Sequence, residues 1–148
     1  MKRKAVTLIE LIIVLALMCI LSTIFAGYIT NYKKTTKLLA EKSFSNNIIG
    51  YVNNAKSYCY ENRVDATLSG DVLGNKLILS NGVKQLSIFK FPNNYKIISA
   101  VNLNGKGFIM IHSDGSVSSK LRINYQDNDN KKNKAITISW GIGYVEFS

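Results

Sequence analysis

The spacing of apolar residues predicts one long helix at the start of the chain. From Leu11 to Tyr32 no residue is charged, and as an α-helix this run would extend about 33 Å, enough to cross a hydrocarbon core of about 30 Å. Farther along, apolar residues recur at the three- and four-residue steps of one buried helical face. They are Phe44, Ile48, Val52, Ala55 and Cys59. We therefore expect a helix from about residue 7 to residue 62, membrane-embedded in its first half and amphipathic in its second.

After Asn62 the pattern changes to short runs of alternating apolar and polar residues, broken by turn pairs, which is typical of β-strands. The runs predict strands at 76–80, 83–89, 95–99, 107–113, 118–125, 135–140 and 143–147. Asn81-Gly82 and Asp114-Gly115 predict hairpins because these residues tolerate positive φ, and Asn104-Gly105 predicts a looser reversal. The predicted fold class is α+β, a long N-terminal helix packed on a small C-terminal antiparallel sheet or two-sheet sandwich.

The start of the chain predicts a membrane anchor. Lys2, Arg3 and Lys4 precede the apolar run, so the positive-inside rule places the N-terminus in the cytoplasm and the remaining chain outside it. A cleaved signal peptide has a similar pattern, with a possible cut after Ala26. Against it, the run is longer than the usual signal core of about 7–15 residues, and Ile24 is a poor small residue three places before the cut.

Glu10 is a carboxylate inside the apolar run. Placing such a group in the apolar layer costs about 2.5–3.5 kcal/mol on insertion scales, so it normally has a partner and a function. The alternative is that Glu10 lies at the depth of the lipid headgroups.

Residues 2–21, KRKAVTLIELIIVLALMCIL, resemble the N-terminus of type IV prepilins and pseudopilins. That family has a short basic leader, a small residue at the cut and a Phe-Thr-Leu-Ile-Glu-Leu start to a long apolar helix. With Glu10 fifth in the mature chain, the resemblance implies cleavage by a membrane prepilin peptidase between Ala5 and Val6, and N-methylation of Val6. The chain has Ala5 where the family usually has Gly, Val6 where it usually has Phe, and Gly27 where many major pilins have Pro.

The resemblance implies a structural subunit of the minor kind, in a type IV pilus or a type II secretion or competence pseudopilus. The carboxylate of Glu10 would neutralise the new α-amino group of a neighbouring subunit, which offsets the desolvation of both charges. The implied partners are other pilin subunits, the prepilin peptidase and the inner-membrane assembly platform. The subunit would be a single-pass protein of the cytoplasmic membrane with its C-terminal domain extracytoplasmic, later assembled into a cell-surface or periplasmic filament.

The same resemblance divides the chain into a leader at 1–5, a transmembrane and assembly half of the helix at 6–32, an amphipathic half at 33–62 and a β-rich domain at 63–148. The order of one helix followed only by strands resembles minor pseudopilins of the GspH and FimT kind and the small competence pilins. The ending KAITISWGIGYVEF resembles their closing pair of strands.

Catalytic and metal-binding patterns are weak, and we predict no enzyme and no cofactor. His112-Ser113-Asp114 has the residue types of a hydrolase triad, yet three consecutive residues cannot converge in that geometry. Asp127 and Asp129 offer oxygens for calcium, which some pseudopilins bind, but the glycine and distal glutamate of an EF-hand loop are absent, so a solvated hairpin loop is favoured.

The two cysteines and the single histidine are too dispersed for a zinc site. Cys19 and Cys59 would lie about 60 Å apart along a continuous helix, too far for a disulfide. Cys59 falls on the apolar stripe and is predicted to be a core residue.

The basic charge raises an alternative function, a DNA-binding pilin of a competence uptake machine. The net charge is +10, or +7 once Lys2, Arg3 and Lys4 are removed. Lys131, Lys132 and Lys134 fall in a predicted hairpin loop, where they would contact phosphates in a salt-dependent way. Against this, the chain is rich in Asn and Ile, as AT-rich coding would produce, and no aromatic platform interleaves with the loop.

Overall fold

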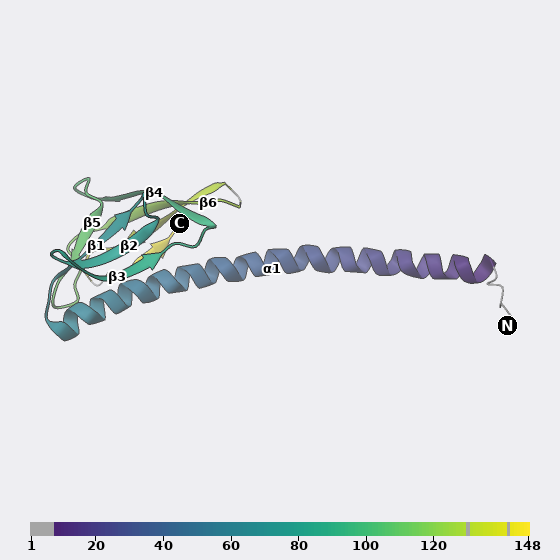
Figure 1. Ribbon diagram of the computed structural model, residues 1–148, viewed down its shortest axis with the longest axis horizontal. Coiled ribbons are helices and arrows are strands. Elements are labelled where there is room, and N and C mark those ends of the chain that lie inside the picture. Colours follow the sequence, from purple (N-terminus) through teal and green to yellow (C-terminus); the bar gives the residue numbers. More distant parts are fainter. Residues whose placement is uncertain (1–7, 130, 142) are drawn as a thin grey trace. The chain divides into compact units, whose positions relative to one another are not determined.

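The computed structural model describes residues 8–129, 131–141 and 143–148. Within these residues one helix is followed by strands only, as the apolar spacing predicted (Figure 1). The elements are α1 (Leu8–Asn62), β1 (Ala66–Asp71), β2 (Lys76–Asn81), β3 (Lys84–Lys90), β4 (Tyr95–Asn102), β5 (Phe108–Ile111), β6 (Leu121–Asp127), β7 (Lys132–Ile138) and β8 (Val145–Phe147). The chain forms two compact units, residues 1–44 and 45–148.

The described part of the first unit is helical throughout. Its segment Leu8–Phe25 has a mean hydropathy of 2.8, and none of it is buried. By length and composition this segment can cross a membrane.

The predicted apolar stripe of α1 is confirmed. Ile48, Val52 and Cys59 have no exposed surface, and Phe44 and Ala55 are 3% exposed. The helix ends where Arg63 takes a left-handed conformation, with φ of 53°. The N–H of Val64 then donates to the carbonyl of Cys59 (3.1 Å), a bond typical of a helix C-terminus closed by a left-handed residue.

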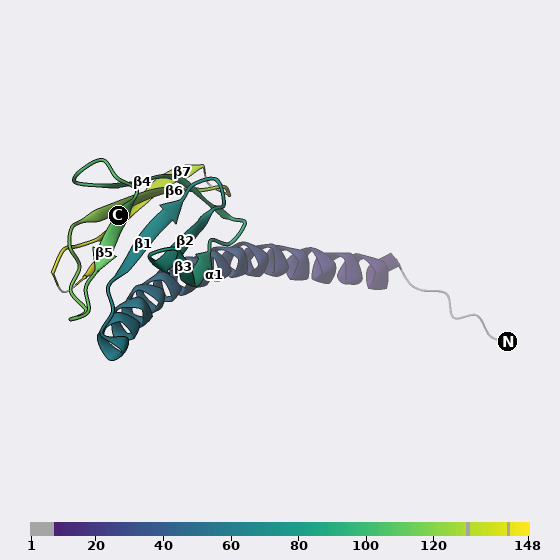
Figure 2. The same ribbon diagram turned by 60° about the vertical axis from the view of Figure 1, so that its left-hand side comes forward.

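The strands form two antiparallel sheets of four strands each, and the predicted α+β class is confirmed. The first has the order β3-β2-β1-β5 and the second β4-β6-β7-β8. Figure 2 shows β1, β2, β3 and β5 side by side in one layer, with β4, β6 and β7 in the other. The core of the second unit consists of apolar side chains from both sheets and from Ile48, Val52, Ala55 and Cys59 of α1. Its fully buried sheet residues include Leu68, Leu77, Ile111, Ile97, Leu121, Ile123, Ile136 and Ile138.

The two sheets approach closely near Gly70 of β1. Its N–H donates to the carbonyl of Gly107 (3.1 Å), and a Cβ at position 70 would lie 2.5 Å from the Cβ of Ala100 in β4. Asn75 links the β1–β2 turn to β4 through two hydrogen bonds. Its amide donates to the carbonyl of Tyr95 (2.8 Å) and its side-chain oxygen accepts from the N–H of Ile97 (2.8 Å).

The sequence pattern missed β1 and placed one turn a residue too early. All seven predicted strands are present, but β1 was not predicted because ATLSGD has few apolar residues. In the β2–β3 hairpin Asn81 pairs with Lys84, so the two loop residues are Gly82 and Val83, and Gly82 has the positive φ of 58°. Asp114-Gly115 lies within a longer reversal that brings Ile111 opposite Val117, with Gly115 at φ of 79°.

Candidate functional site

The start of α1 presents apolar side chains on every side of the helix. From Leu8 to Phe25 each large apolar side chain is at least half exposed, from Ile24 at 50% to Leu8 at 76%. Soluble monomers rarely expose contiguous apolar patches larger than a few hundred Å². This surface therefore needs lipid or other protein chains around it.

The hydroxyl groups within this segment are satisfied by the helix itself. The Ser22 hydroxyl donates to the carbonyl of Met18 (2.7 Å), and the Thr23 hydroxyl donates to the carbonyl of Ile20 (2.7 Å). Because each donor bonds to its own helix, neither hydroxyl opposes transfer into an apolar medium.

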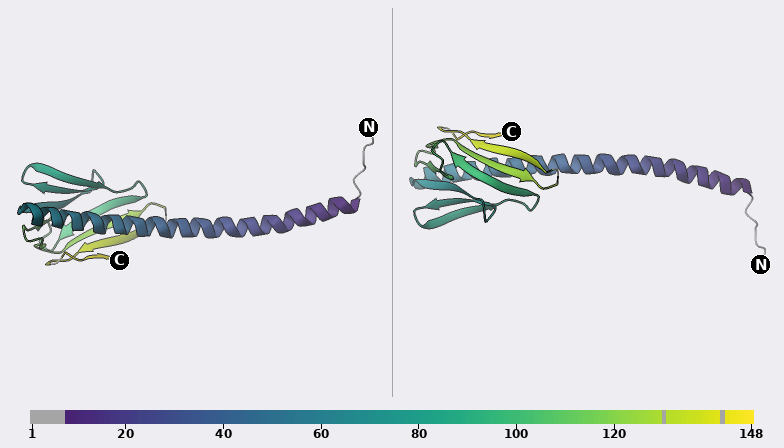
Figure 3. Two further views of the ribbon diagram at one scale, coloured as in Figure 1. Left: turned by 90° about the horizontal axis from the view of Figure 1, so that it is seen from below. Right: turned by 90° about the horizontal axis from the view of Figure 1, so that it is seen from above.

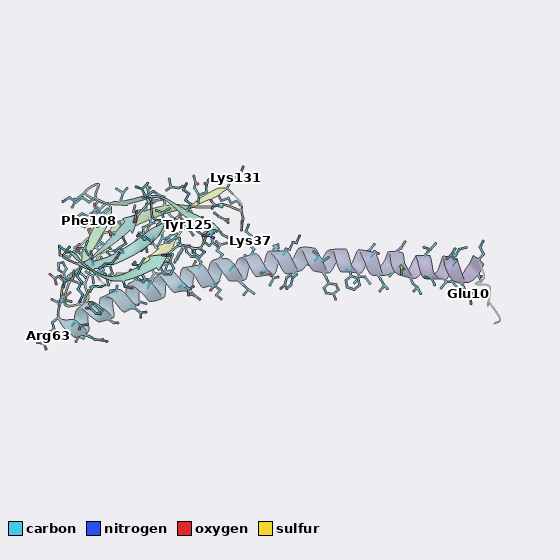
Figure 4. The ribbon with its side chains drawn as sticks, viewed as in Figure 1. Glu10, Lys37, Arg63, Phe108, Tyr125 and Lys131 are labelled. Carbon is cyan, nitrogen blue, oxygen red and sulfur yellow. The ribbon has the colours of Figure 1, made fainter. Side chains whose placement is uncertain are left out.

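Glu10 is the acidic residue in the first turn of α1, and Figure 4 shows it at the N-terminal end of the helix. A carboxylate at this end complements the positive end of the helix dipole, worth about 0.3–1 kcal/mol at an exposed site. The predicted cleavage site at Ala5 and Val6 lies outside the described residues.

The three lysines predicted to share a loop are divided by the structure. Lys131 lies in the loop, with φ of 53°, and Figure 4 shows it at the tip of the hairpin. Lys132 and Lys134 belong to β7, so their placement in the loop was wrong. The first three residues of β7, Lys132 to Lys134, are all polar. They therefore lack the alternation of apolar and polar residues from which a strand is predicted.

The same hairpin carries acids that oppose a phosphate-binding role. Lys132 pairs directly with Asp127 across the strands, and the carboxylate of Asp127 accepts the N–H of Asp129 (3.0 Å). The exposed aromatic ring of Trp140 lies two residues past the end of β7 that is opposite Lys132. DNA contact by these lysines stays a prediction, and the local charge balance and the position of Trp140 disfavour it.

His112, Ser113 and Asp114 form a turn. The carboxylate of Asp65 accepts the N–H of Ser113 (2.7 Å) and lies 3.6 Å from Nδ1 of His112. Hydrogen bonds from the hydroxyl and the N–H of Ser116 hold the pKa of Asp114 below its usual range. Asp114 is thus an ionised turn acceptor.

Among the described residues, no three His, Cys, Asp or Glu side chains gather in a geometry that would hold a metal ion. Asp129 instead accepts a long hydrogen bond from the amide of Asn94 (3.4 Å). Cys59 is buried, and burial together with the charge of Asp65 raises the pKa of its thiol.

Comparison with known proteins adds two findings. Residues 1–26 match the family model of the prokaryotic N-terminal methylation motif. The fold is similar to the crystal structure of the type IV minor pilin FimU of Pseudomonas aeruginosa, with a TM-score of 0.51 and 12% sequence identity over 72% of this chain and 87% of that one. No curated protein sequence matches the chain.

Proposed function

We propose that this chain, which has the N-terminal methylation motif and the fold of a type IV pilin, serves as a minor structural subunit of a type IV pilus or of a type II secretion or competence pseudopilus. The observation that carries the proposal is that the motif at residues 1–26 includes the helical segment Leu8–Phe25, which is apolar enough to cross a membrane and has no buried part. This motif and this fold belong to structural subunits and not to enzymes.

Processing would begin at the membrane. A prepilin peptidase would cut between Ala5 and Val6, removing Lys2, Arg3 and Lys4 together with the leader, and Val6 would be N-methylated. Loss of the three cations removes the charges that hold the N-terminus at the cytoplasmic surface. The apolar start of α1 would then be able to leave the bilayer for a filament.

Glu10 would act in assembly through its charge. Cleavage would place the new α-amino group four residues before Glu10 in the chain. In an apolar filament core, an amine of one subunit and the Glu10 carboxylate of another would compensate each other's desolvation. This pairing would also fix how neighbouring helices are aligned.

Mass spectrometry of the chain, co-expressed with a prepilin peptidase, tests the processing step. We expect a product that begins at Val6 and carries an N-methyl group, and an inactive peptidase as control should leave the chain starting at Met1. A product cut after Ala26 would instead identify a secretory signal and contradict the proposal.

Glu10→Gln tests the assembly step separately, because it keeps the size of the side chain and removes its charge. We expect normal membrane insertion and cleavage but little incorporation into sheared filaments. Ser22→Ala is the matched control in the same helix, since its hydroxyl bonds only to its own helix. Equal incorporation of Glu10→Gln and Ser22→Ala would refute the charge pair.

A further inference from the structure

β3 is an open edge of the first sheet. It pairs with β2 on one side and has no described strand on the other. Figure 3 shows the β2–β3 hairpin at the margin of the domain, on the opposite side of residues 45–62 of α1 from β8. The N–H of Phe91 donates toward β2, to the carbonyl of Asn75 (3.0 Å). Because successive residues of a strand alternate in direction, the N–H groups of Ile88 and Lys90 point outward, where another strand would bond to them.

The outer face of this edge carries an apolar row beside Lys90. Ile88 of β3 is 43% exposed and stands in register with Ile78 of β2, which in turn stands in register with Ser69 of β1. The row ends at Phe108 of β5, opposite Ser69 and 40% exposed. A strand added beside β3 would extend this row with a residue next to Ile88.

The inner side of the edge borders a groove of about 430 Å³. Tyr51, Asn54, Ala55 and Tyr58 of α1 line one wall, and residues 84–87 line the other. The Tyr51 hydroxyl donates to the carbonyl of Ser87 (3.1 Å), and its ring stacks at a tilt on Phe89 at 5.5 Å. These contacts fix Tyr51 against β3, and the groove beside it has room for side chains on the inner face of an added strand.

The ends of β3 carry charges that select among partners. The strand starts at Lys84 and ends at Lys90, and both side chains are exposed. Full antiparallel pairing of β3 with a second copy of itself would place Lys84 opposite Lys90 at both ends, and like charges in opposed positions are destabilising. An added strand with acidic residues at the corresponding positions would instead be attracted.

We propose that the β3 edge binds an extended acidic segment of a different protein chain as a fifth strand. The main chain of that segment would bond to the outward groups of Ile88 and Lys90. One of its apolar side chains would cover Ile88, a glutamate or aspartate two positions away would pair with Lys90, and a large apolar residue of the opposite face would enter the groove beside Tyr58. The main-chain hydrogen bonds would supply affinity, as in other cases of strand addition, and the contacts with Ile88, Lys90 and the groove would supply specificity.

The test uses the full chain in detergent micelles and a blocked, fluorescent peptide, Thr-Glu-Thr-Val-Phe-Thr-Glu. Antiparallel to β3, its valine falls opposite Ile88 and its first glutamate opposite Lys90. A second peptide has lysine in place of both glutamates. Binding is followed by fluorescence anisotropy, and hydrogen exchange of the amides of Ile88 and Lys90 reports whether the edge is the site.

Lys90→Glu is the informative variant because it changes an exposed side chain and leaves the strand intact. We expect this variant to bind the glutamate peptide about fivefold more weakly than the parent chain and the lysine peptide more tightly by a similar factor. Lys120→Glu, an exposed change of equal charge outside the strands, should alter neither. Slower exchange at Ile88 and Lys90 with the glutamate peptide would complete the support.

Three results would each overturn the inference. One is the absence of saturable binding by either peptide, and another is an equal effect of Lys90→Glu and Lys120→Glu, which would show attraction to net charge alone. The third is protection of the Ile88 and Lys90 amides that rises with the concentration of the chain itself and without peptide, which would identify a second copy as the occupant.

Discussion

Gly70→Ala tests the close approach of the two sheets. A Cβ at position 70 would lie 2.5 Å from the Cβ of Ala100. Alanine has no rotamer through which to withdraw, so the backbones of β1 and β4 would have to separate. The hydrogen bond from Gly70 to the carbonyl of Gly107 (3.1 Å) opposes that movement.

Overpacking of this kind destabilises the folded state by about 1–3 kcal/mol. Replacing glycine also reduces the conformational entropy of the unfolded chain, which favours folding by about 0.4–1 kcal/mol. We therefore expect the free energy of unfolding to fall by about 1.3 kcal/mol, the difference between the midpoints of these two ranges. Gly50→Ala is the matched control, because nothing outside its own helix lies within 4 Å of a Cβ there. It should raise the free energy of unfolding by about 0.5–1 kcal/mol.

Urea unfolding of the full chain in micelles, in a Cys19→Ser background, measures these changes. Pulse alkylation of Cys59 follows the transition, because this thiol has no exposed surface in the folded domain. Ala100→Gly removes the obstructing methyl group, so the double variant should recover most of the loss caused by Gly70→Ala. A Gly70→Ala chain as stable as its parent, or the same loss with and without Ala100→Gly, would refute the packing explanation.

Three further predictions concern the same domain. Asn75→Ala removes two hydrogen bonds of 2.8 Å between the β1–β2 turn and β4 and should lower the free energy of unfolding by about 2 kcal/mol in urea titrations. The N–H of Gly74 holds the pKa of Asp71 below its usual range, so this carboxylate stabilises the fold above pH of about 4 and ceases to do so as pH falls through its folded pKa. The melting temperature of the parent should then fall more steeply in acid than that of Asp71→Asn. Iodoacetamide should label Cys59 at least about 100-fold more slowly in the folded chain than in urea, since burial both covers the thiol and raises its pKa.

Local patterns were sufficient for the helix and most strands. The stripe from Phe44 to Cys59 follows directly from helical periodicity, and its burial is confirmed. β1 escaped prediction because Leu68 and Ala66 are its apolar residues, and its remaining residues are polar or glycine. Its pairing with both β2 and β5 supplies the stability that its composition does not indicate.

Features that depend on residues distant in the sequence could not be predicted. The pattern places a turn near Asn104-Gly105 but does not show that the chain changes sheets there, from β4 to β5. Lys132 and Lys134 were misplaced because strand assignment for polar residues comes from their partners, here Asp127 and Tyr125 on β6. The open edge at β3 is likewise a property of sheet order, and its sequence KQLSIFK shows only a strand between two lysines.

The two ends of α1 differ in how their apolar side chains are covered, although the helix is continuous. From Ile48 to Cys59 the buried residues form one stripe, and the core of the domain covers that stripe. From Leu8 to Phe25 the helix is exposed and apolar on every side, and no part of this segment is buried among the described residues. The second arrangement is stable only when lipid or other subunits supply the missing apolar contacts. The helix is therefore suited to exchange one apolar environment for another, and Glu10, as the charge within that segment, is the side chain whose desolvation would distinguish the bilayer from a filament.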